Sequence, residues 1–174
     1  MPTPLVSEHA IDEAVRDLAR RLRDDYRDSV PLLVGVLKGS FVFIADLVRE
    51  LGIPCEIDFV RARSYGGGQT SAGAVEITKD VETRLEGRHI VVVEDIADTG
   101  LTMEVVFKRI QAGHPASVRR CALFMRQGCD PPPDYVGIEL GPGFVVGYGI
   151  DLAERHRELR EIYRAADIDD QDSR

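Results

Sequence analysis

The chain has 174 residues, of which 44% are hydrophobic, which suits one globular domain with its own core. A net charge of -8 disfavours a protein that binds nucleic acid through its phosphates, because that binding depends on clustered Lys and Arg. No apolar run approaches the roughly 20 residues that a membrane span needs. The cysteines lack paired or metal-like spacing, and the N-terminus lacks an apolar signal segment. We therefore expect one cytoplasmic domain over residues 1–174, with neither nucleic acid nor a membrane as partner.

The first part of the chain predicts helix, strand, helix and strand. Apolar residues recur at helical spacing from Ile11 to Leu22, behind the capping residue Ser7. Residues 32–37 are apolar throughout, which is typical of a strand buried on both faces. The next predicted elements are a helix over 41–51 that stops at Gly52, a strand over 55–65, and a mobile loop over 65–74 that has too few apolar groups to pack.

The second part repeats this alternation. It predicts a strand over 89–93, a helix over 102–111 closed by Gly113, a strand over 118–124, two short strands in "YVGIEL" and "FVVGYG", a helix over 152–163, and a frayed polar tail over 165–174. Strands that alternate with helices indicate an α/β fold with a mainly parallel, twisted sheet and helices on both faces. Functional sites in such sheets lie at the carboxyl ends of the strands.

The stretch "VVVEDIADTGLTM" brings acids to such a strand end. Backbone N–H groups of the turn that follows can converge on a phosphate, with threonine hydroxyls helping; the turn comprises Thr99, Gly100, Leu101 and Thr102. Glu94 and Asp95 can hold ribose hydroxyls or a hydrated Mg²⁺, and Asp98 is placed to exchange a proton with a bound group. The alternative is that Asp98 only caps the following helix and that the other acids are solvated.

The apolar strand with two acids and a D-[TS]-G-x-T loop, here 91–102, resembles the type I phosphoribosyltransferase family. Three further segments resemble its hypoxanthine-guanine branch: "GVLKGSFVFIADLVREL", "RARSYG" and "PDYVGIEL-GPGFVVGYGIDLAERHREL". The resemblance implies that family's fold with a small C-terminal hood segment. It also implies a purine salvage enzyme that transfers the 5-phosphoribosyl group of phosphoribosyl pyrophosphate (PRPP) to N9 of a 6-oxopurine, with Mg²⁺ as cofactor and a homodimer or homotetramer as assembly.

The resemblance also implies a role for individual residues. Glu94 and Asp95 bind the ribose hydroxyls, Asp98 is the general base or acid at purine N7, and 98–102 hold the 5′-phosphate. Lys38, Gly39 and Arg157 meet the pyrophosphate, with a non-proline cis peptide at "LKG". Phe144 stacks on the base, and main-chain groups at Val145 and near Asp151 read its edge. Asp151, with Glu94 and Asp95, holds the metal, and the lid includes Ser64 and Tyr65.

Several of these residues have an ordinary structural alternative. Phe144 fits a core position, Lys38 a surface charge, Arg157 the solvated face of a charged helix, and Tyr65 a strand-end aromatic. None of the four histidines has the spacing of a metal ligand.

Two positions depart from the family pattern and bear on base choice. Arg126 stands where these enzymes usually place the lysine that donates to the purine 6-oxo group, and Gly143 replaces a lysine beside the stacking aromatic. The preference among hypoxanthine, guanine and xanthine therefore stays open. Two alternative functions are a PRPP- or nucleotide-sensing regulator without catalysis and a transferase that prefers xanthine or a pyrimidine.

Overall fold

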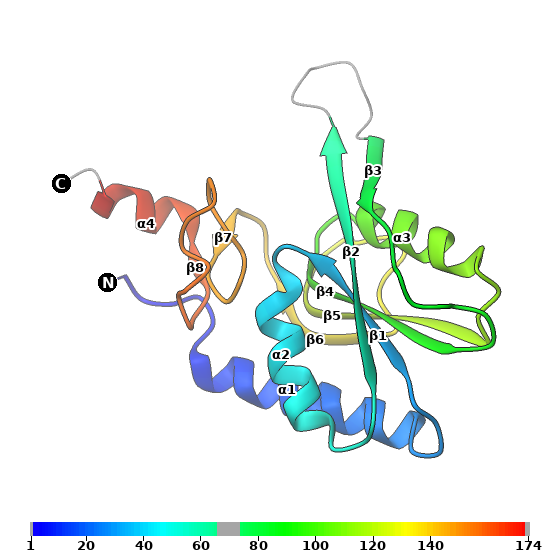
Figure 1. The fold of residues 1–174 in the computed structure, drawn as a ribbon. Coiled ribbons are helices and arrows are strands. Elements are labelled where there is room, and N and C mark those ends of the chain that lie inside the picture. The colour runs from blue at the N-terminus through cyan, green and yellow to red at the C-terminus, as the bar shows by residue number, and fades with distance from the viewer. Residues whose placement is uncertain (1, 66–73, 173–174) are drawn as a thin grey trace.

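The computed structural model describes residues 2–65 and 74–172. Its elements in chain order are α1 (Glu8–Asp25), β1 (Leu32–Leu37), α2 (Ser40–Leu51), β2 (Glu56–Tyr65), β3 (Ala74–Lys79), β4 (His89–Ala97), α3 (Leu101–Gln111), β5 (Ser117–Arg126), β6 (Tyr135–Leu140), β7 (Val145–Val146), β8 (Tyr163–Arg164) and α4 (Ala165–Asp172). Figure 1 shows their arrangement. The mobile loop expected over 65–74 falls on residues outside the described range, apart from its two ends.

The main sheet has six strands in the order β3-β2-β1-β4-β5-β6 (Figure 1). All neighbouring strands pair parallel except β2 and β3, which are antiparallel. The mainly parallel α/β fold expected from the sequence is thus confirmed. Because β1 and β4 are adjacent in the middle of the sheet, the loops that follow them meet at one edge.

Helices cover both faces of the sheet, and successive residues of each central strand serve opposite faces. Leu33 of β1 packs in the cluster that contains residues of α1 and α2, including Leu18 and Phe43. Its neighbours Leu32 and Val34 pack in a second cluster with Met103, Val106 and Ile110 of α3. This two-sided burial explains why β1 is apolar throughout.

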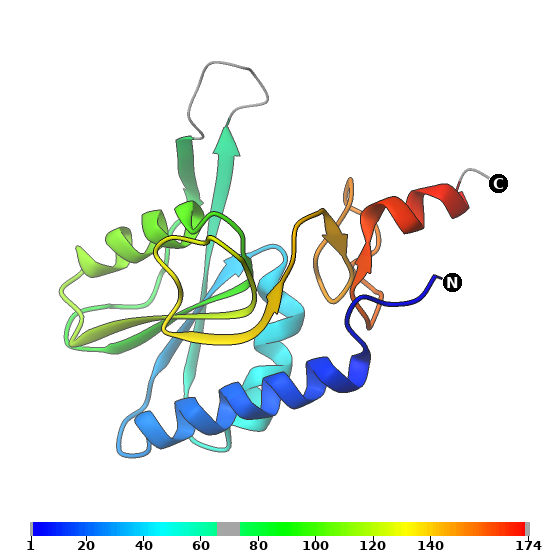
Figure 2. The same cartoon turned by 180° about the vertical axis from the view of Figure 1, so that it is seen from behind.

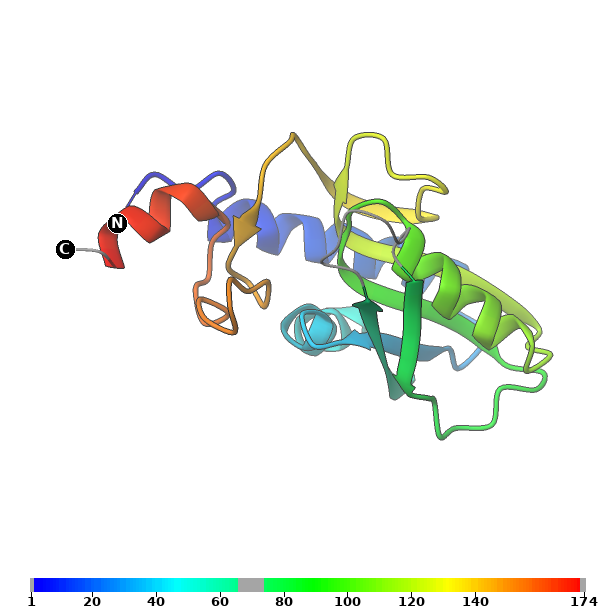
Figure 3. The same cartoon turned by 90° about the horizontal axis from the view of Figure 1, so that it is seen from above.

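The C-terminal part forms a small hood beside the sheet (Figures 2 and 3). Strands β7 and β8 pair antiparallel, and the hood has its own apolar cluster with Val146, Tyr163, Ala165 and Ile168. The chain's N-terminal segment joins it through a bridge between Val6 and Ile162. The hood segment implied by the family resemblance is therefore present.

Two predictions for this region were wrong. Residues 152–163 form turns, an isolated bridge between Leu152 and Arg155, and the first residue of β8 instead of a helix, because Ala153, Glu154 and His156 all have positive φ. The tail is not frayed throughout, since α4 covers Ala165–Asp172 and buries Ile168.

Smaller differences concern strand and helix ends. Strand β4 continues past the expected end at Val93 to Ala97, so it carries the acids within the sheet. Strand β3 was not predicted. Gly113 does not close α3 in a left-handed conformation; that conformation belongs to His114. A side chain at Gly113 would lie 2.7 Å from Leu85, so close packing explains the glycine. Among the helices of the described residues, none combines the length and apolar character that a membrane crossing requires.

Candidate active site

The loop after β1 touches the end of β4 at the carboxyl edge of the sheet. Lys38 and Gly39 follow β1, and the Leu37–Lys38 peptide bond is cis, as the family resemblance implies. A Cβ on Gly39 would lie only 1.9 Å from Asp95 Oδ2. A side chain at this position would therefore displace the Asp95 carboxylate of β4, which packs against the backbone of this loop.

Glu94 and Asp95 are buried at the end of β4, with relative exposures of 8% and 9%. Burial raises the pKa of Glu94 well above its ordinary value, and the nearby Asp95 and Asp98 carboxylates add to the rise. Burial also raises the pKa of Asp95 to about 6, against the opposing effect of backbone N–H groups and Arg157. Two buried acids this close require hydrogen-bond donors or a cation before both can be charged.

The segment 98–102 leads from β4 into α3. Gly100 adopts φ 86 at the helix N-terminus, and a side chain there would lie 2.7 Å from the Asp130 carbonyl oxygen. Leu101 N donates to Thr99 Oγ1 at 3.3 Å. The first turn of α3 has N–H groups without intrahelical acceptors, so this end suits an anion.

Asp98 does not cap α3, because Gly100 occupies the cap position and no side chain caps it. The capping alternative is therefore wrong. The Asp98 side chain is 70% exposed, and its Oδ1 lies 3.7 Å from Nε of Arg126. Its carboxylate is thus accessible to a bound group.

A second group of charged residues gathers where the hood faces the sheet. Nη2 of Arg157 lies 2.8 Å from Asp151 Oδ1 and 3.1 Å from Glu154 Oε2, and its Nη1 donates to the Gly149 carbonyl oxygen at 2.7 Å. Lys38 Nζ donates to both Glu154 oxygens, at 2.8 and 2.9 Å. Arg157 is not on a helix and its side chain is only 19% exposed, so the solvated-helix alternative is wrong.

Asp95 and this second group line one cavity of about 500 Å³, a size typical of small-molecule sites, whereas Glu94 and the segment 98–102 are not among its lining residues. Lys38, Gly39 and Asp95 line it from the sheet, and Asp151 and Arg157 from the hood side. Three further charged residues line the cavity, and no role was predicted for them from the sequence: Arg61, Arg63 and Glu154. The two arginines lie two positions apart on β2, and this spacing on a strand is the signal that could have identified them.

Of the residues expected to hold a base, Asp151 lines this cavity, whereas Arg126, Phe144 and Val145 are not among its lining residues. Phe144 is 86% exposed, so it is not a core residue, whereas Val145 is buried in β7. Arg126 donates from Nη1 to the Gly141 carbonyl oxygen and from Nη2 to that of Gly143. The guanidinium therefore connects the end of β5 with the segment that carries Phe144.

The expected lid residues Ser64 and Tyr65 lie at the end of β2, and the description of the chain does not extend to their side chains. Within the described residues, no group of three or more His, Cys, Asp and Glu side chains is arranged to hold a metal ion alone. The oxygens of Glu94, Asp95 and Asp151 still suit Mg²⁺, which is usually held by one or two carboxylates together with substrate phosphates and water.

The sequence and the fold both match known proteins. A family model described as phosphoribosyl transferase domain matches residues 4–152. Hypoxanthine phosphoribosyltransferase of Haemophilus influenzae is 40% identical over 164 residues, covering 91% of this chain and 92% of the relative. Hypoxanthine-guanine phosphoribosyltransferase of Bacillus subtilis is 40% identical over 161 residues, covering 91% and 89%. A crystal structure of a hypoxanthine-guanine phosphoribosyltransferase from Bacillus anthracis has a TM-score of 0.89 and 36% identity, covering 95% of this chain and 99% of that chain.

Proposed function

The chain belongs to the phosphoribosyltransferase family, and we propose that it transfers the 5-phosphoribosyl group of PRPP to N9 of hypoxanthine, guanine or both, with release of pyrophosphate. One observation carries this proposal: the buried acids of β4 and the N-terminus of α3 lie at the same sheet edge as the cations Lys38 and Arg157. PRPP needs hydrogen-bond acceptors for its ribose hydroxyls, an anion site for its 5′-phosphate and cations for its pyrophosphate.

The ribose-phosphate part of PRPP matches the end of β4 and the loop after it. The 5′-phosphate would bind at 98–102, where the backbone N–H groups of the first turn of α3 can donate to it. The ribose hydroxyls would donate to Glu94 and Asp95, giving these buried carboxylates the partners that they need.

The pyrophosphate would bind at Lys38, Gly39 and Arg157. Departure of this group leaves positive charge at C1′ and negative charge on the leaving oxygens, so cations held beside it lower the barrier. Glu94, Asp95 and Asp151 would hold Mg²⁺, which supplies further neutralisation of the phosphate charge when it is bound.

The base would stack on the exposed face of Phe144, and main-chain groups at Val145 and near Asp151 would read its edge. Arg126 lies beside this platform and can donate to a 6-oxo group with N–H groups that its two carbonyl partners do not use. Asp98, whose side chain is exposed and lies 3.7 Å from Nε of Arg126, would take or give the proton at N7. A lid that includes Ser64 and Tyr65 would exclude water from the reactive C1′.

The direct test follows pyrophosphate release from PRPP and Mg²⁺ with hypoxanthine, guanine, xanthine, adenine and uracil in turn. Turnover with hypoxanthine or guanine is the expected result, and the rates rank the 6-oxopurines that Arg126 and Gly143 permit. Binding of PRPP without turnover of any base would favour a regulator. We further propose a cytoplasmic homodimer or homotetramer, as in the family; light scattering of the purified protein measures the assembly.

Asp98→Asn tests the acid-base role within this reaction. The variant keeps the shape of the side chain but cannot accept a proton, so we expect kcat to fall by about 10²–10⁴-fold. The KM for PRPP should change far less, because the phosphate contacts come from backbone groups. Steady-state kinetics with hypoxanthine measure both constants, and an unchanged kcat would remove Asp98 from the mechanism.

A further inference from the structure

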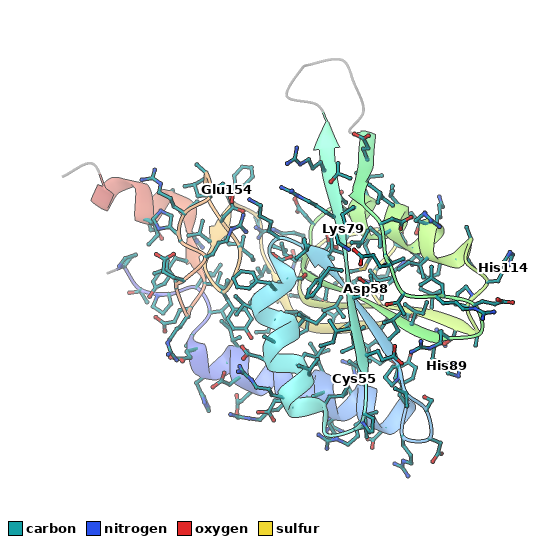
Figure 4. All side chains as sticks on the ribbon, in the orientation of Figure 1. Cys55, Asp58, Lys79, His89, His114 and Glu154 are labelled. Carbon is teal, nitrogen blue, oxygen red and sulfur yellow. The ribbon has the colours of Figure 1, made fainter. Side chains whose placement is uncertain are left out.

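Glu154 holds both cations of the proposed pyrophosphate subsite. Its two carboxylate oxygens accept from Lys38 Nζ at 2.8 and 2.9 Å, and Oε2 also lies 3.1 Å from Arg157 Nη2. Figure 4 shows Glu154 where the hood approaches the sheet, at the end of the molecule opposite Cys55 and His89. A carboxylate therefore occupies the position between the cations that a phosphate oxygen would need.

The backbone fixes Glu154 in this position. Glu154 has φ 65, and its backbone N donates to Asp151 Oδ2 at 2.9 Å, which is the tight turn that replaces the expected helix. The carboxylate is thus presented to Lys38 by a turn that Asp151 itself organises.

We propose that Glu154 is an internal competitor of pyrophosphate: its carboxylate pairs with Lys38 and Arg157, gives way when the pyrophosphate group of PRPP binds, and returns as pyrophosphate leaves. The inference rests on the proposed function, because it takes the two cations as pyrophosphate ligands. It assigns this chain a residue that weakens binding of the substrate's pyrophosphate and promotes release of the product.

The ion pairs of Glu154 are weak enough for pyrophosphate to displace its carboxylate. The side chains of Glu154 and Lys38 are 63% and 47% exposed, and ion pairs in contact with water are weak. A pyrophosphate brings more negative charge than one carboxylate and can replace it.

The two cations respond differently when Glu154 leaves. Arg157 keeps Asp151 and the Gly149 carbonyl oxygen, so its guanidinium stays in place. Lys38, in the described part of the chain, bonds through Nζ to Glu154 alone, so it becomes free to follow the pyrophosphate. Removing the charge of Glu154 should therefore improve the subsite without dismantling it.

The test compares Glu154→Gln with the matched control Glu158→Gln, which removes the same charge from an exposed residue of the same segment. Titration calorimetry measures the affinity for pyrophosphate in the presence of Mg²⁺, without any turnover. We expect Glu154→Gln to bind pyrophosphate about 2- to 10-fold more tightly, as loss of weak exposed ion pairs predicts. In Glu154→Gln, the KM for PRPP and the product-inhibition constant of pyrophosphate should fall by the same factor, while the KM for hypoxanthine stays unchanged. In Glu158→Gln, all of these constants should match those of the wild type.

An unchanged or weaker affinity in Glu154→Gln would overturn the inference. Because a glutamine oxygen can still accept from Lys38, Glu154→Ala is measured as well, and it must also bind pyrophosphate more tightly than the wild type. If the wild type turns over hypoxanthine while neither variant gains affinity, only this inference fails. If the wild type binds no pyrophosphate and turns over no base, the proposed function fails with it.

Discussion

Arg126 connects the catalytic candidate Asp98 with the platform for the base. Its guanidinium donates to the carbonyl oxygens of Gly141 and Gly143, while its Nε faces Asp98 at 3.7 Å. The side chain of Phe144, next along the chain, is 86% exposed and gains little support from packing. A planar guanidinium can donate to both carbonyl oxygens at once through two separate nitrogens. A lysine at this position has only one ammonium nitrogen.

We therefore expect Arg126→Lys to raise the KM for hypoxanthine about 10-fold, as loss of one hydrogen bond from a charged donor predicts. The KM for PRPP should stay within about 2-fold, because the contacts of Arg126 lie on the base side. Steady-state kinetics with each substrate varied measure the two constants. Arg16→Lys on the exposed side of α1 is the control. Equal changes in both KM values would mean that Arg126 supports the site as a whole.

At the scale of elements, α4 supports the base platform. Its first residue, Ala165, donates its backbone N–H to the Phe144 carbonyl oxygen at 2.9 Å. Ile168 anchors the helix in the hood cluster with Val146 and Tyr163. We expect Ile168→Ala to lower the free energy of unfolding by about 2 kcal/mol and to raise the KM for hypoxanthine more than that for PRPP.

Urea unfolding and kinetics of the same preparations check this prediction. Asp167→Ala, on the exposed side of the same helix, should change both quantities little. A loss of stability without any change in the KM for hypoxanthine would separate α4 from the base site.

Individual elements show how much of the fold and of the candidate site could be predicted from the sequence. The buried parallel strands were predictable, because β1 needs apolar residues on both faces and shows them. The position of the acids at the carboxyl end of a buried strand, next to the loop 98–102, was predictable from the order of residues in the stretch 91–103, and their role as a site stays a prediction. Residues 152–163 were not, because their spacing suits a helix whereas Ala153, Glu154 and His156 adopt positive φ, which a helix does not allow. The position of Glu154 beside Lys38 depends on that turn and was invisible in the sequence.

At the scale of the whole molecule, the buried acids of the candidate site lower the free energy of unfolding. Glu94 and Asp95 are buried at the end of a strand that packs against both apolar cores, and burial raises the pKa of each acid. A charged carboxylate in that position costs free energy until a ligand or cation compensates it. Binding of PRPP and Mg²⁺ should therefore stabilise the fold as well as form the complex.

The free-energy cost of burying a charged carboxylate can be measured at Asp95. Its pKa rises from 3.8 to about 6 on folding, so between these pH values the folded protein binds more protons than the unfolded chain. The contribution of Asp95 to stability is therefore lost as the pH rises through about 6. About two pKa units correspond to roughly 3 kcal/mol. Asp95→Asn removes the charge, so its stability relative to the wild type should increase by up to that amount between pH 4 and pH 7.

Urea unfolding of both proteins at pH 4, 5, 6 and 7 in EDTA measures the difference, and Asp28→Asn on the surface supplies the baseline for loss of an exposed acid. The amide can lose some of the backbone hydrogen bonds that Asp95 accepts, but that loss is the same at every pH. The slope against pH therefore reports the buried charge of Asp95 together with its effect on the pKa of Glu94. A difference between Asp95→Asn and wild type that is flat from pH 4 to pH 7 would show that the carboxylate is already compensated within the folded chain, and that ligand binding has no such cost to relieve.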